Sequence, residues 1–347
     1  MSLWNDPSLQ RIFSRKIPLI DVRAPIEFDL GSIPHSVNIP IMNDEERALV
    51  GTCYKKQGQE KAIELGHKLV SGAIKENRVG QWKDYILKNP EAELFCFRGG
   101  LRSQTSCQWL KEVGIERTPL AGGYKRLRGF FLSWLDEAPL PSLIRLGGPT
   151  GSGKSQVLQN FQNIDLETLA HHRGSAFGDQ GIQPSQITFE NNLALKLLES
   201  FNKTILIEDE SAMIGKVSIP RRLFTHLRHA PLVLLKIDKE KRIENIYHQY
   251  VQGAEKEFFL MSLFRIQKRL GGLRFKEIQD EMISSFDNGK TFEDHCKWIQ
   301  MLLDWYYDPF YAQDLLRQPG EILFEGNEKE ITEYLKASVK VLRPEFN

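Results

Sequence analysis

Residues 143–162 read LIRLGGPTGSGKSQVLQNFQ, which is an apolar run, then a glycine-rich loop, then a helical pattern. From Gly148 to Ser155 the segment matches G-x4-G-K-S in full, the pattern of a loop whose backbone N–H groups bind phosphate oxygens. The loop stands between an apolar strand and a helix, which is the context this motif requires. The segment therefore predicts an α/β domain that binds phosphate groups.

The residues of this loop have separable roles. Its glycines let the backbone N–H groups point at a phosphate, Lys154 neutralises the terminal phosphate charge, and the Ser155 hydroxyl can bind Mg²⁺. A second ligand for such an ion is expected at the end of the strand TILIED (204–209), where we favour Asp209. The pattern specifies phosphate rather than a nucleotide, so ATP, GTP and a prenyl diphosphate all stay open. The residues assigned to phosphate are Gly148, Thr150, Gly151, Gly153, Lys154 and Ser155.

The composition of the chain is that of an ordinary globular protein. It has 347 residues, of which 41% are hydrophobic and 26% are charged, and its formal net charge is +1. That length exceeds what one hydrophobic core usually organises, so two domains are expected. No stretch approaches the roughly 20 apolar residues that span a bilayer, and the first residues lack the pattern of a secretory signal. We therefore expect a cytoplasmic protein without a membrane partner, whose four cysteines are reduced thiols.

Short apolar runs alternate with helical patterns along most of the chain, as is typical of parallel sheets covered by helices. The segment DEAPLPS (136–142) combines two prolines with acidic residues and is the predicted linker. We predict one α/β domain over 1–135 and a second over 143–347, whose C-terminal part is helical from about residue 247 to residue 317. Strands are expected at 17–22, 37–41 and 94–97 in the first domain, and near 143–147, 204–209 and 231–238 in the second.

A second motif lies in the first domain, where LFCFRGGLRSQTSCQWL (94–110) places Cys96 between an apolar strand and a helical pattern. A cysteine there faces converging backbone N–H groups and the positive end of a helix dipole. These features and the neighbouring arginines stabilise a thiolate, so Cys96 is the predicted nucleophile. The spacing from Cys96 to the second arginine is C-x5-R. The anion loop around the cysteine comprises Arg98, Gly99, Gly100, Arg102 and Ser103.

The first domain resembles the rhodanese superfamily, and the resemblance extends beyond the cysteine loop. LIDVRAPIEFDLGSIPHSVNIP (19–40) is similar to that family's D-V-R…E-F…G-x-I-P signature, and LAGGYKRL (120–127) resembles its L-x-G-G element. In rhodaneses the loop cysteine carries a transferable sulfur. Those enzymes use C-x4-R, however, whereas C-x5-R is the spacing of cysteine phosphatases, whose wider loop holds a tetrahedral oxyanion. A phosphate-like donor is therefore expected, and a phosphatase stays open although no general-acid aspartate is identified.

Nearly the whole chain resembles the tRNA 2-selenouridine synthases. The likeness rests on segments 50–70, 96–103, 147–155, 166–178 and 207–215, among them VGTCYKKQGQEKAIELGHKLV and LETLAHHRGSAFG. The resemblance implies a rhodanese-like domain followed by a P-loop NTPase-like α/β domain. It also implies that 2-thiouridine in the anticodon region of tRNA is converted to 2-selenouridine.

The resemblance implies two co-substrates as well. Geranyl diphosphate would alkylate the thiouridine sulfur at the P-loop, where Lys154 and Mg²⁺ stabilise the departing diphosphate. Selenophosphate would pass its selenium through Cys96, by thiolate attack on selenium with phosphate departing. The apolar run FFLMSLF (258–264) is a candidate wall for the prenyl tail.

A net charge near zero means that RNA would have to be held by local basic patches. Candidates occur in three clusters, at KRLR (125–128), at PRR (220–222) and around RLGGLR (269–274). Lysine and arginine side chains in such clusters contact backbone phosphates. The residues predicted to bind RNA are Arg126, Arg128, Arg221, Arg222, Arg269 and Arg274.

Two further functions fit the motifs. One is a nucleotide-dependent sulfurtransferase or kinase-like enzyme, which the P-loop would also serve. The other is a non-catalytic RNA-binding scaffold, against which the complete C-x5-R loop and the complete P-loop both argue.

Overall fold

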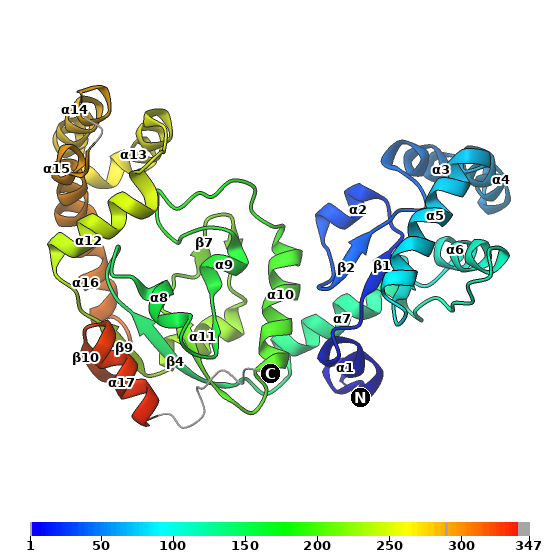
Figure 1. The fold of residues 1–347 in the computed structure, drawn as a ribbon, viewed down its shortest axis with the longest axis horizontal. Helices are drawn as coiled ribbons and strands as arrows, with labels where there is room; N and C mark the ends of the chain where they lie inside the picture. Colours follow the sequence, from blue (N-terminus) through cyan, green and yellow to red (C-terminus); the bar gives the residue numbers. More distant parts are fainter. Residues whose placement is uncertain (1, 289–290, 339–347) are drawn as a thin grey trace. The chain divides into compact units, whose positions relative to one another are not determined.

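The computed structural model describes residues 2–288 and 291–338 and divides the chain into two compact units, drawn in Figure 1. Unit 1 comprises Met1–Pro139 and Ser185–Glu199, and unit 2 comprises Leu140–Pro184 and Ser200–Asn347. The division after Pro139 lies within the predicted linker, 136–142. The sequence prediction placed 185–199 in the second domain, whereas this segment belongs to unit 1. Residues 339–347 of the predicted second domain lie outside the described residues.

Unit 1 is built on a small parallel sheet. Its strands β1 (Leu19–Asp21), β2 (Ser36–Asn38) and β3 (Glu93–Phe95) have the order β2-β1-β3. A parallel bridge between Leu94 and Pro119 extends the sheet beyond β3. The three strands lie within or beside the runs predicted at 17–22, 37–41 and 94–97, because those runs supply side chains that the helices on both faces bury.

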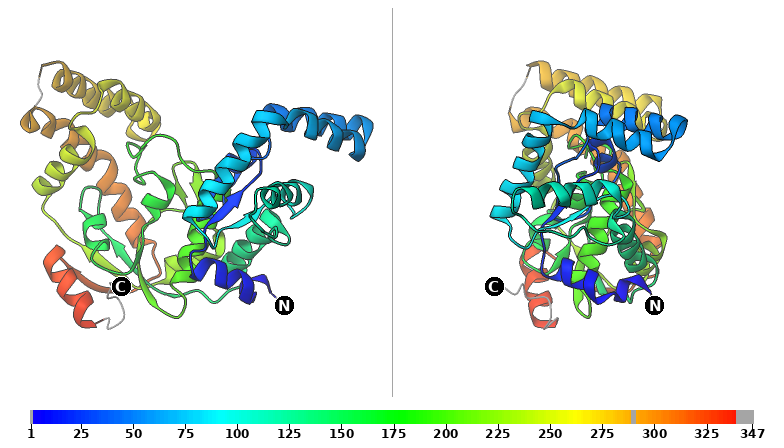
Figure 2. Two further views of the ribbon diagram at one scale, coloured as in Figure 1. Left: turned by 45° about the vertical axis from the view of Figure 1, so that its right-hand side comes forward. Right: turned by 90° about the vertical axis from the view of Figure 1, so that its right-hand side faces the viewer.

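Helices surround this sheet, and their starts carry recognisable caps. The Asp6 carboxylate accepts a hydrogen bond from the Ser8 amide ahead of α1, and Asn43 with Glu46 forms a capping box at the start of α3. Figure 2 shows α3 and α4 as a pair of neighbouring helices at one end of the unit. The helices of unit 1 are η1 (Leu3–Asn5), α1 (Pro7–Ser14), α2 (Pro25–Leu30), α3 (Asp44–Gln57), α4 (Gln59–Leu69), α5 (Gly72–Lys88), α6 (Leu101–Glu112), α7 (Gly123–Asp136) and α10 (Gln186–Glu199).

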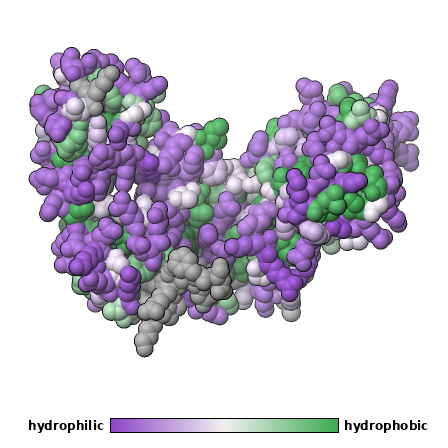
Figure 3. Space-filling model, viewed as in Figure 1, coloured by the Kyte–Doolittle hydropathy of each residue, from purple (hydrophilic) through white to green (hydrophobic). Residues whose placement is uncertain are grey.

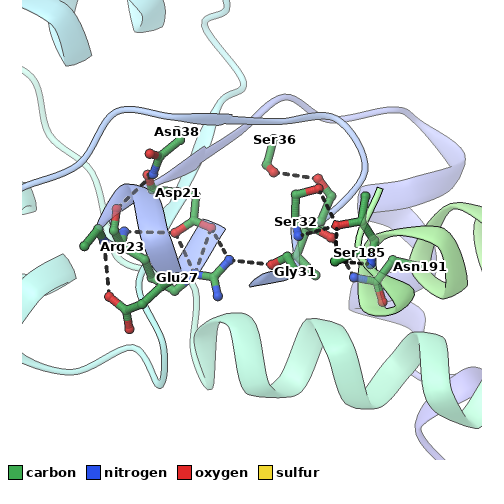
Figure 4. A network of polar contacts seen from close by, with 12 residues as sticks. Asp21, Arg23, Glu27, Gly31, Ser32, Ser36, Asn38, Ser185 and Asn191 are labelled. Carbon is green, nitrogen blue, oxygen red and sulfur yellow. Dashed lines mark hydrogen bonds and ion pairs between the residues drawn. The ribbon is translucent and has the colours of Figure 1, made fainter. Parts of the chain in front are cut away.

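A buried polar network fixes the end of β1, as Figure 4 shows. The Arg23 guanidinium forms an ion pair with Asp21 at 2.6 Å, and both side chains are at most 2% exposed. Arg23 also donates to the Gly31 carbonyl at 2.9 Å, and the Asn38 amide donates to the carbonyls of Asp21 and Arg23. These contacts hold the β1–α2 connection against β2. Asp21 and Arg23 therefore act as structural residues of unit 1.

Helix α10 is attached to unit 1 by hydrogen bonds to the segment that follows α2. The Ser32 amide donates to Thr188 Oγ1 at 3.0 Å, and Asn191 Nδ2 donates to the Ser32 carbonyl at 2.6 Å. From α7, Arg128 donates to Asn191 Oδ1 at 2.7 Å and forms an ion pair with Glu190. These contacts explain why the segment packs with the first unit although it follows the P-loop in sequence.

Unit 2 is built on a larger parallel sheet with the strand order β10-β9-β4-β6-β5. The strand that leads into the P-loop, β4, is central, and its neighbours β6 and β9 bury aliphatic side chains on both faces. This arrangement is a P-loop α/β sheet. The strands of unit 2 are β4 (Ser142–Gly147), β5 (Asn163–Ile164), β6 (Thr204–Glu208), β9 (Leu232–Leu235) and β10 (Ile322–Gly326), together with a short hairpin of β7 (Met213–Ile214) and β8 (Val217–Ser218).

The C-terminal part of unit 2 is helical, as predicted for 247–317, with its own core around Phe259, Met282 and Trp298. Two of its segments are π-helical, with a wider turn than an α-helix: η2 (Tyr247–Val251) and η3 (Leu303–Tyr307). The α-helices of unit 2 are α8 (Lys154–Leu158), α9 (Leu166–Ala170), α11 (Arg221–His229), α12 (Lys239–Ile246), α13 (Lys256–Leu270), α14 (Gly272–Asn288), α15 (Phe292–Leu302), α16 (Asp308–Leu316) and α17 (Glu328–Ser338).

The surface agrees with the balanced composition. On the face seen in Figure 3, hydrophilic residues predominate in both units and hydrophobic residues form separate patches. Within residues 2–288 and 291–338, no helix combines the length and the apolar character that crossing a bilayer requires.

The packing of α10 on unit 1 predicts the effect of a small substitution at Gly31. A Cβ atom there would lie 2.5 Å from Ile187 Cγ2 and 2.6 Å from the Tyr124 hydroxyl. We expect Gly31→Ala to lower the free energy of unfolding by about 1–3 kcal/mol, because the added methyl overpacks this contact. Urea denaturation followed by circular dichroism measures the change.

Gly51→Ala is the matched control, because a Cβ atom at Gly51 meets nothing within 4 Å and the residue lies inside α3. Alanine there should leave stability unchanged or raise it by up to about 1 kcal/mol. Equal stability of the two variants would mean that α10 does not pack against Gly31 in solution.

Candidate active sites: a cysteine loop and a phosphate-binding loop

Cys96 follows the last residue of β3, and α6 begins five residues later at Leu101. The cysteine is 3% exposed. Its sulfur lies 3.1 Å from the Ser103 hydroxyl and 3.8 Å from the Gly100 carbonyl oxygen. The loop therefore wraps the sulfur, as the motif predicts, and places it beside the first turn of α6.

The segment Gly122–Lys125 donates backbone hydrogen bonds to the cysteine loop. The Tyr124 amide donates to the Cys96 carbonyl at 2.8 Å, and the Lys125 amide donates to the Phe97 carbonyl at 3.0 Å. Gly123 has φ +52°, and a side chain on it would overlap the Cys96 carbonyl oxygen. This close approach explains why the first residue of α7 is a glycine.

Charged partners surround the loop on one side. Arg102 donates to both carboxylate oxygens of Glu27, at 2.5 and 3.1 Å, and Arg47 of α3 approaches the same carboxylate at 3.2 Å. Arg98, in contrast, is exposed, with its guanidinium 5.7 Å from the Phe97 ring centroid. Of the two predicted loop arginines, Arg102 is therefore held in place and Arg98 is open to an incoming anion.

The environment lowers the pKa of the Cys96 thiol below its ordinary value. Burial works against ionisation of the thiol. Its effect is outweighed by the hydrogen bond from the Ser103 hydroxyl, by the backbone amides of Ser103 and Arg98, and by the charge of Arg102. Cys107 on α6 behaves in the opposite way, because burial raises its pKa to about 11. Cys96 is the thiol that this fold activates.

The P-loop connects β4 to α8 with glycines in the left-handed region, Gly151 at φ +81° and Gly153 at φ +86°. The Lys154 ammonium donates to the Gly148 carbonyl at 2.9 Å, so it stays inside the loop. Helix α12 supports the loop through Arg242, which donates to the Thr150 carbonyl, and Asn245, which donates to the Gly151 carbonyl, both at 2.9 Å. Neither supporting residue was predicted from the sequence.

A cavity of about 390 Å³ opens onto the P-loop. This volume lies in the range of small-molecule sites. Its lining is polar at Lys154, Ser155 and Glu210, and it has an aromatic wall formed by Tyr250 from η2 and by Tyr306 and Tyr307 from η3. Phe310 and Tyr311 of α16 complete that wall, and Arg173 and Arg269 also line the cavity.

The aromatic wall continues into a narrow apolar recess that shares Thr150, Ser175, Tyr250 and Tyr307 with the cavity. Its volume is about 30 Å³, which leaves room for only a few water molecules. Phe259 lines it, so one residue of the predicted wall 258–264 reaches this region. Met261 and Phe264 of the same run are instead 61% and 66% exposed.

Asp209, the favoured Mg²⁺ ligand, is engaged elsewhere. Its carboxylate forms an ion pair with Arg145 at 2.9 Å and accepts a hydrogen bond from the Gln318 amide at 3.0 Å. Across residues 2–288 and 291–338, no group of three or more acidic, histidine or cysteine side chains could hold a metal ion. Asp209 lines the cavity together with Ser155, but its carboxylate is committed to Arg145 and Gln318, so it would bind a metal ion only by giving up these partners.

Three buried glutamates lie near the P-loop. Glu208 and Glu210 flank Asp209 at the strand end where the sequence predicts a metal ligand, whereas Glu167 was not predicted. Burial raises the pKa of Glu167, with repulsion by the other two glutamates, and burial with repulsion by Asp165 and Glu210 raises that of Glu208. Burial also raises the pKa of Glu210, although Lys154 opposes it.

The predicted RNA-binding arginines have different surroundings. Arg126 pairs with Asp6 at 2.6 Å, and Arg128 pairs with Glu190. Arg269 donates to the Tyr306 hydroxyl at 3.2 Å, and Arg274 lies 5.6 Å from the Trp305 ring centroid. Arg221 is exposed and Arg222 half-buried at the start of α11. The structure thus brings Arg269 and Arg274 to one region and commits Arg126 and Arg128 to unit 1.

The cysteine environment predicts a pH-dependent reactivity. We expect Cys96 to react with iodoacetamide at lower pH than a free cysteine, because its folded pKa is lowered. Ser103→Ala should move the midpoint of that profile to higher pH, since it removes a hydrogen bond to the thiolate. Peptide mass spectrometry of the alkylated chain resolves each of the four cysteines.

Cys107 serves as the internal control, because a pKa of about 11 keeps it unreactive over the same range. An unchanged Cys96 midpoint in Ser103→Ala would show that the hydroxyl does not stabilise the thiolate.

Comparison with known proteins identifies the relatives of this chain. Residues 141–341 match the family model described as the tRNA 2-selenouridine synthase AAA domain. A tRNA 2-selenouridine synthase of Nitrosomonas europaea is 40% identical, over 95% of this chain and 97% of its own length. The protein of the same name from Marinobacter nauticus is 43% identical over 94% of this chain and 96% of its own.

A third relative with that name, from Bdellovibrio bacteriovorus, is 41% identical over 96% of this chain and 99% of its own length. Among solved structures, an N-terminal domain from Clostridium difficile 630 is 34% identical and covers 34% of this chain, with a TM-score of 0.32. Matches at this identity over nearly the full length on both sides leave no large segment unaccounted for. The chain therefore belongs to the tRNA 2-selenouridine synthase family.

Proposed function

We propose that this chain is a cytoplasmic enzyme that converts 2-thiouridine at the wobble position of tRNA to 2-selenouridine. In this proposal, unit 1 is a rhodanese-like domain that handles selenophosphate, and the P-loop of unit 2 binds geranyl diphosphate. The observation that carries the proposal is the presence of two anion sites in one chain, an activated thiol in its loop and a P-loop that faces an aromatic cavity. The names of the full-length relatives supply the substrate class.

The rhodanese-like assignment of unit 1 rests on its local geometry. Cys96 directly follows strand β3, its loop leads into helix α6, and the segment that begins with two glycines donates backbone hydrogen bonds to the loop. The wider C-x5-R loop suits a tetrahedral donor such as selenophosphate. Arg98 is exposed beside the loop and can meet the donor's charge, while Arg102 adds fixed positive potential.

The P-loop cavity suits geranyl diphosphate at both of its ends. Backbone N–H groups and Lys154 would hold the diphosphate, and the neutral aromatic wall would take the prenyl tail. Burial raises the pKa of Tyr250 and Tyr307, so these side chains stay uncharged. The tail belongs in the main cavity, because the recess of about 30 Å³ is too small for a ten-carbon chain.

Geranylation would proceed by attack of the thiouridine sulfur on the allylic carbon. The new bond joins sulfur to carbon, the carbon–oxygen bond to diphosphate breaks, and N3 of the base loses its proton. Lys154 would leave the Gly148 carbonyl to stabilise the charge on the departing diphosphate. Mg²⁺, if bound, would neutralise part of the same charge, with Ser155 as the protein ligand.

The selenium step is balanced when the Cys96 thiolate attacks phosphorus rather than selenium. Attack on selenium with phosphate as the product would require an oxidant, because selenium would lose two electrons. Attack on phosphorus breaks the phosphorus–selenium bond, places the phosphoryl group on the Cys96 sulfur and releases hydrogen selenide, and water then frees phosphate. The C-x5-R spacing favours this step, since that loop suits a tetrahedral phosphorus centre.

Hydrogen selenide would then replace sulfur on the base. It adds to C2 of the geranylated thiouracil, the bond from C2 to the geranyl-bearing sulfur breaks, and geranyl thiol departs with a proton. The order of the two sites follows from this chemistry, because alkylation turns sulfur into a leaving group.

Substitution of one residue in each unit tests the proposal. Wild-type protein, 2-thiouridine tRNA, geranyl diphosphate and selenophosphate should yield 2-selenouridine, measured by mass spectrometry of the digested nucleosides. Cys96→Ser should accumulate the geranylated nucleoside and form at least 100-fold less 2-selenouridine, because the nucleophile is lost. Lys154→Ala should form neither product from thiolated tRNA, because the diphosphate loses its cation.

Supplying chemically geranylated tRNA to Lys154→Ala is the matched control, and it should restore selenouridine because unit 1 is intact. Unchanged selenation by Cys96→Ser would remove the assigned role of the cysteine. Lys154-dependent hydrolysis of ATP or GTP without geranyl transfer would instead favour the nucleotide-dependent sulfurtransferase. A phosphoryl group on the Cys96 peptide after acid quenching would support attack at phosphorus.

A further inference from the structure

We propose that the turn between α13 and α14, together with the exposed face of Phe310, is the surface through which single-stranded RNA enters the P-loop cavity. This inference rests on the proposed function, and it assigns the part of unit 2 that binds the tRNA. We define the entry surface by its side chains: Arg265, Lys268, Arg269, Arg274, Lys276 and Phe310.

Among the described residues, the five cations of the entry surface have no carboxylate partner. All five are exposed, and none forms an ion pair with any residue in 2–288 or 291–338. Other basic residues of the same helices are paired, such as Lys256 with Asp287 at 2.6 Å. Five uncompensated positive charges within twelve residues attract a polyanion, and their free donors suit phosphate oxygens.

Aromatic rings lie beside these cations. The Arg269 guanidinium is 5.8 Å from the Phe310 ring centroid and donates to the Tyr306 hydroxyl, while Arg274 lies against Trp305, the residue before Tyr306. Phe310 packs against Tyr306 with centroids 5.1 Å apart but stays 45% exposed. An exposed ring flanked by arginine is the arrangement on which proteins stack a splayed-out base.

The entry surface is continuous with the site of chemistry. Arg269, Tyr306 and Phe310 line the same cavity as Lys154 of the P-loop. A base that stacks on Phe310 while Arg269 holds a neighbouring phosphate therefore stands at the mouth of the cavity that would hold the prenyl donor. The position of the entry surface suits the proposed reaction, because geranylation needs the base and the diphosphate in one cavity.

Two of the other predicted RNA-binding arginines differ in this respect. Arg126 and Arg128 are committed to Asp6 and Glu190 and would have to break these ion pairs before binding phosphate. Their removal is thus expected to affect folding of unit 1 rather than RNA affinity. This contrast separates the entry surface from basic clusters that look equivalent in sequence.

The test measures tRNA binding by the full-length protein as a function of salt. Filter binding with thiolated tRNA gives Kd at several KCl concentrations for the wild type, for Arg269→Gln/Arg274→Gln and for Lys241→Gln/Lys297→Gln. The control pair removes the same charge from exposed, ion-paired lysines of unit 2. The arginine double variant should lower the slope of log Kd against log salt by roughly 0.7 for each lost contact, and the control should not.

Phe310→Leu tests the stacking role separately. It should weaken binding of a single-stranded anticodon-loop RNA on the order of tenfold with an unchanged salt slope, because it removes a ring and no charge. Ultraviolet cross-linking of the same RNA should map to residues 265–276 or to Phe310. Thermal unfolding midpoints equal to the wild type confirm that all variants are folded.

The outcomes distinguish the two proposals. If wild-type protein neither binds nor modifies thiolated tRNA, the proposed function fails. If the wild type binds tRNA and the arginine double variant binds with the same Kd and slope, the entry surface is wrong while the proposed function stands. Cross-links confined to unit 1 would also overturn the entry surface.

Discussion

Both anion-binding loops depend on backbone that comes too close to its neighbours to leave room for a side chain. Gly123 lies against the Cys96 carbonyl, and a Cβ atom on Gly151 of the P-loop would come within 2.8 Å of the Arg242 carbonyl. Both glycines also have φ in the left-handed region, which other residues rarely adopt. Without this freedom the N–H groups could not converge, and neither loop would be an anion site.

One cation of each site has an internal partner before any anion arrives. Arg102 is held by Glu27, and Lys154 by the Gly148 carbonyl. An anion that binds Arg102 or Lys154 directly must attract the cation more strongly than its neutral or singly charged internal partner does. This requirement favours multiply charged groups such as selenophosphate and diphosphate. The internal partners also keep the two cations ordered, so binding costs little side-chain entropy.

The local chemistry of both sites could be predicted from the sequence because the residues of each loop are contiguous. A strand, a glycine-rich turn and a helix follow one another at Cys96 and again at Lys154. The apolar runs also predict where β1, β2, β3, β4, β6 and β9 lie along the chain. The partners of Asp209 and Arg128 could not be predicted in this way. Arg145 is 64 residues from Asp209, and Glu190 is 62 residues from Arg128, so these pairs form only once the strands and helices pack.

The membership of α10 illustrates the same limit. Its sequence follows the P-loop segment, and nothing in its apolar periodicity indicates a partner in unit 1. The partner is set by specific polar contacts, such as Asn191 on the Ser32 carbonyl, and by the absence of a side chain at Gly31. Contacts of this kind join residues that are far apart in the sequence, so a local sequence pattern does not predict them.

The walls of the P-loop cavity depend on a further feature that no local pattern signals. Two π-helical segments, η2 and η3, supply Tyr250, Tyr306 and Tyr307 to the cavity. In an α-helix consecutive residues point about 100° apart, whereas Tyr306 and Tyr307 both line this cavity. π-Helical turns are rare and occur frequently at functional sites.

The result is a cavity with three kinds of lining. Lys154 lines it with Glu167 and Glu210, the tyrosines of η2 and η3 give it an aromatic wall, and Arg269 adds a second cation beside Tyr306. A nucleoside triphosphate would place its phosphates at Lys154 and its base on the aromatic wall, which leaves Arg269 without a phosphate to bind. A prenyl diphosphate together with a single RNA base uses all three, since the tail needs an apolar wall and the base needs both an aromatic ring and a cation for its phosphate.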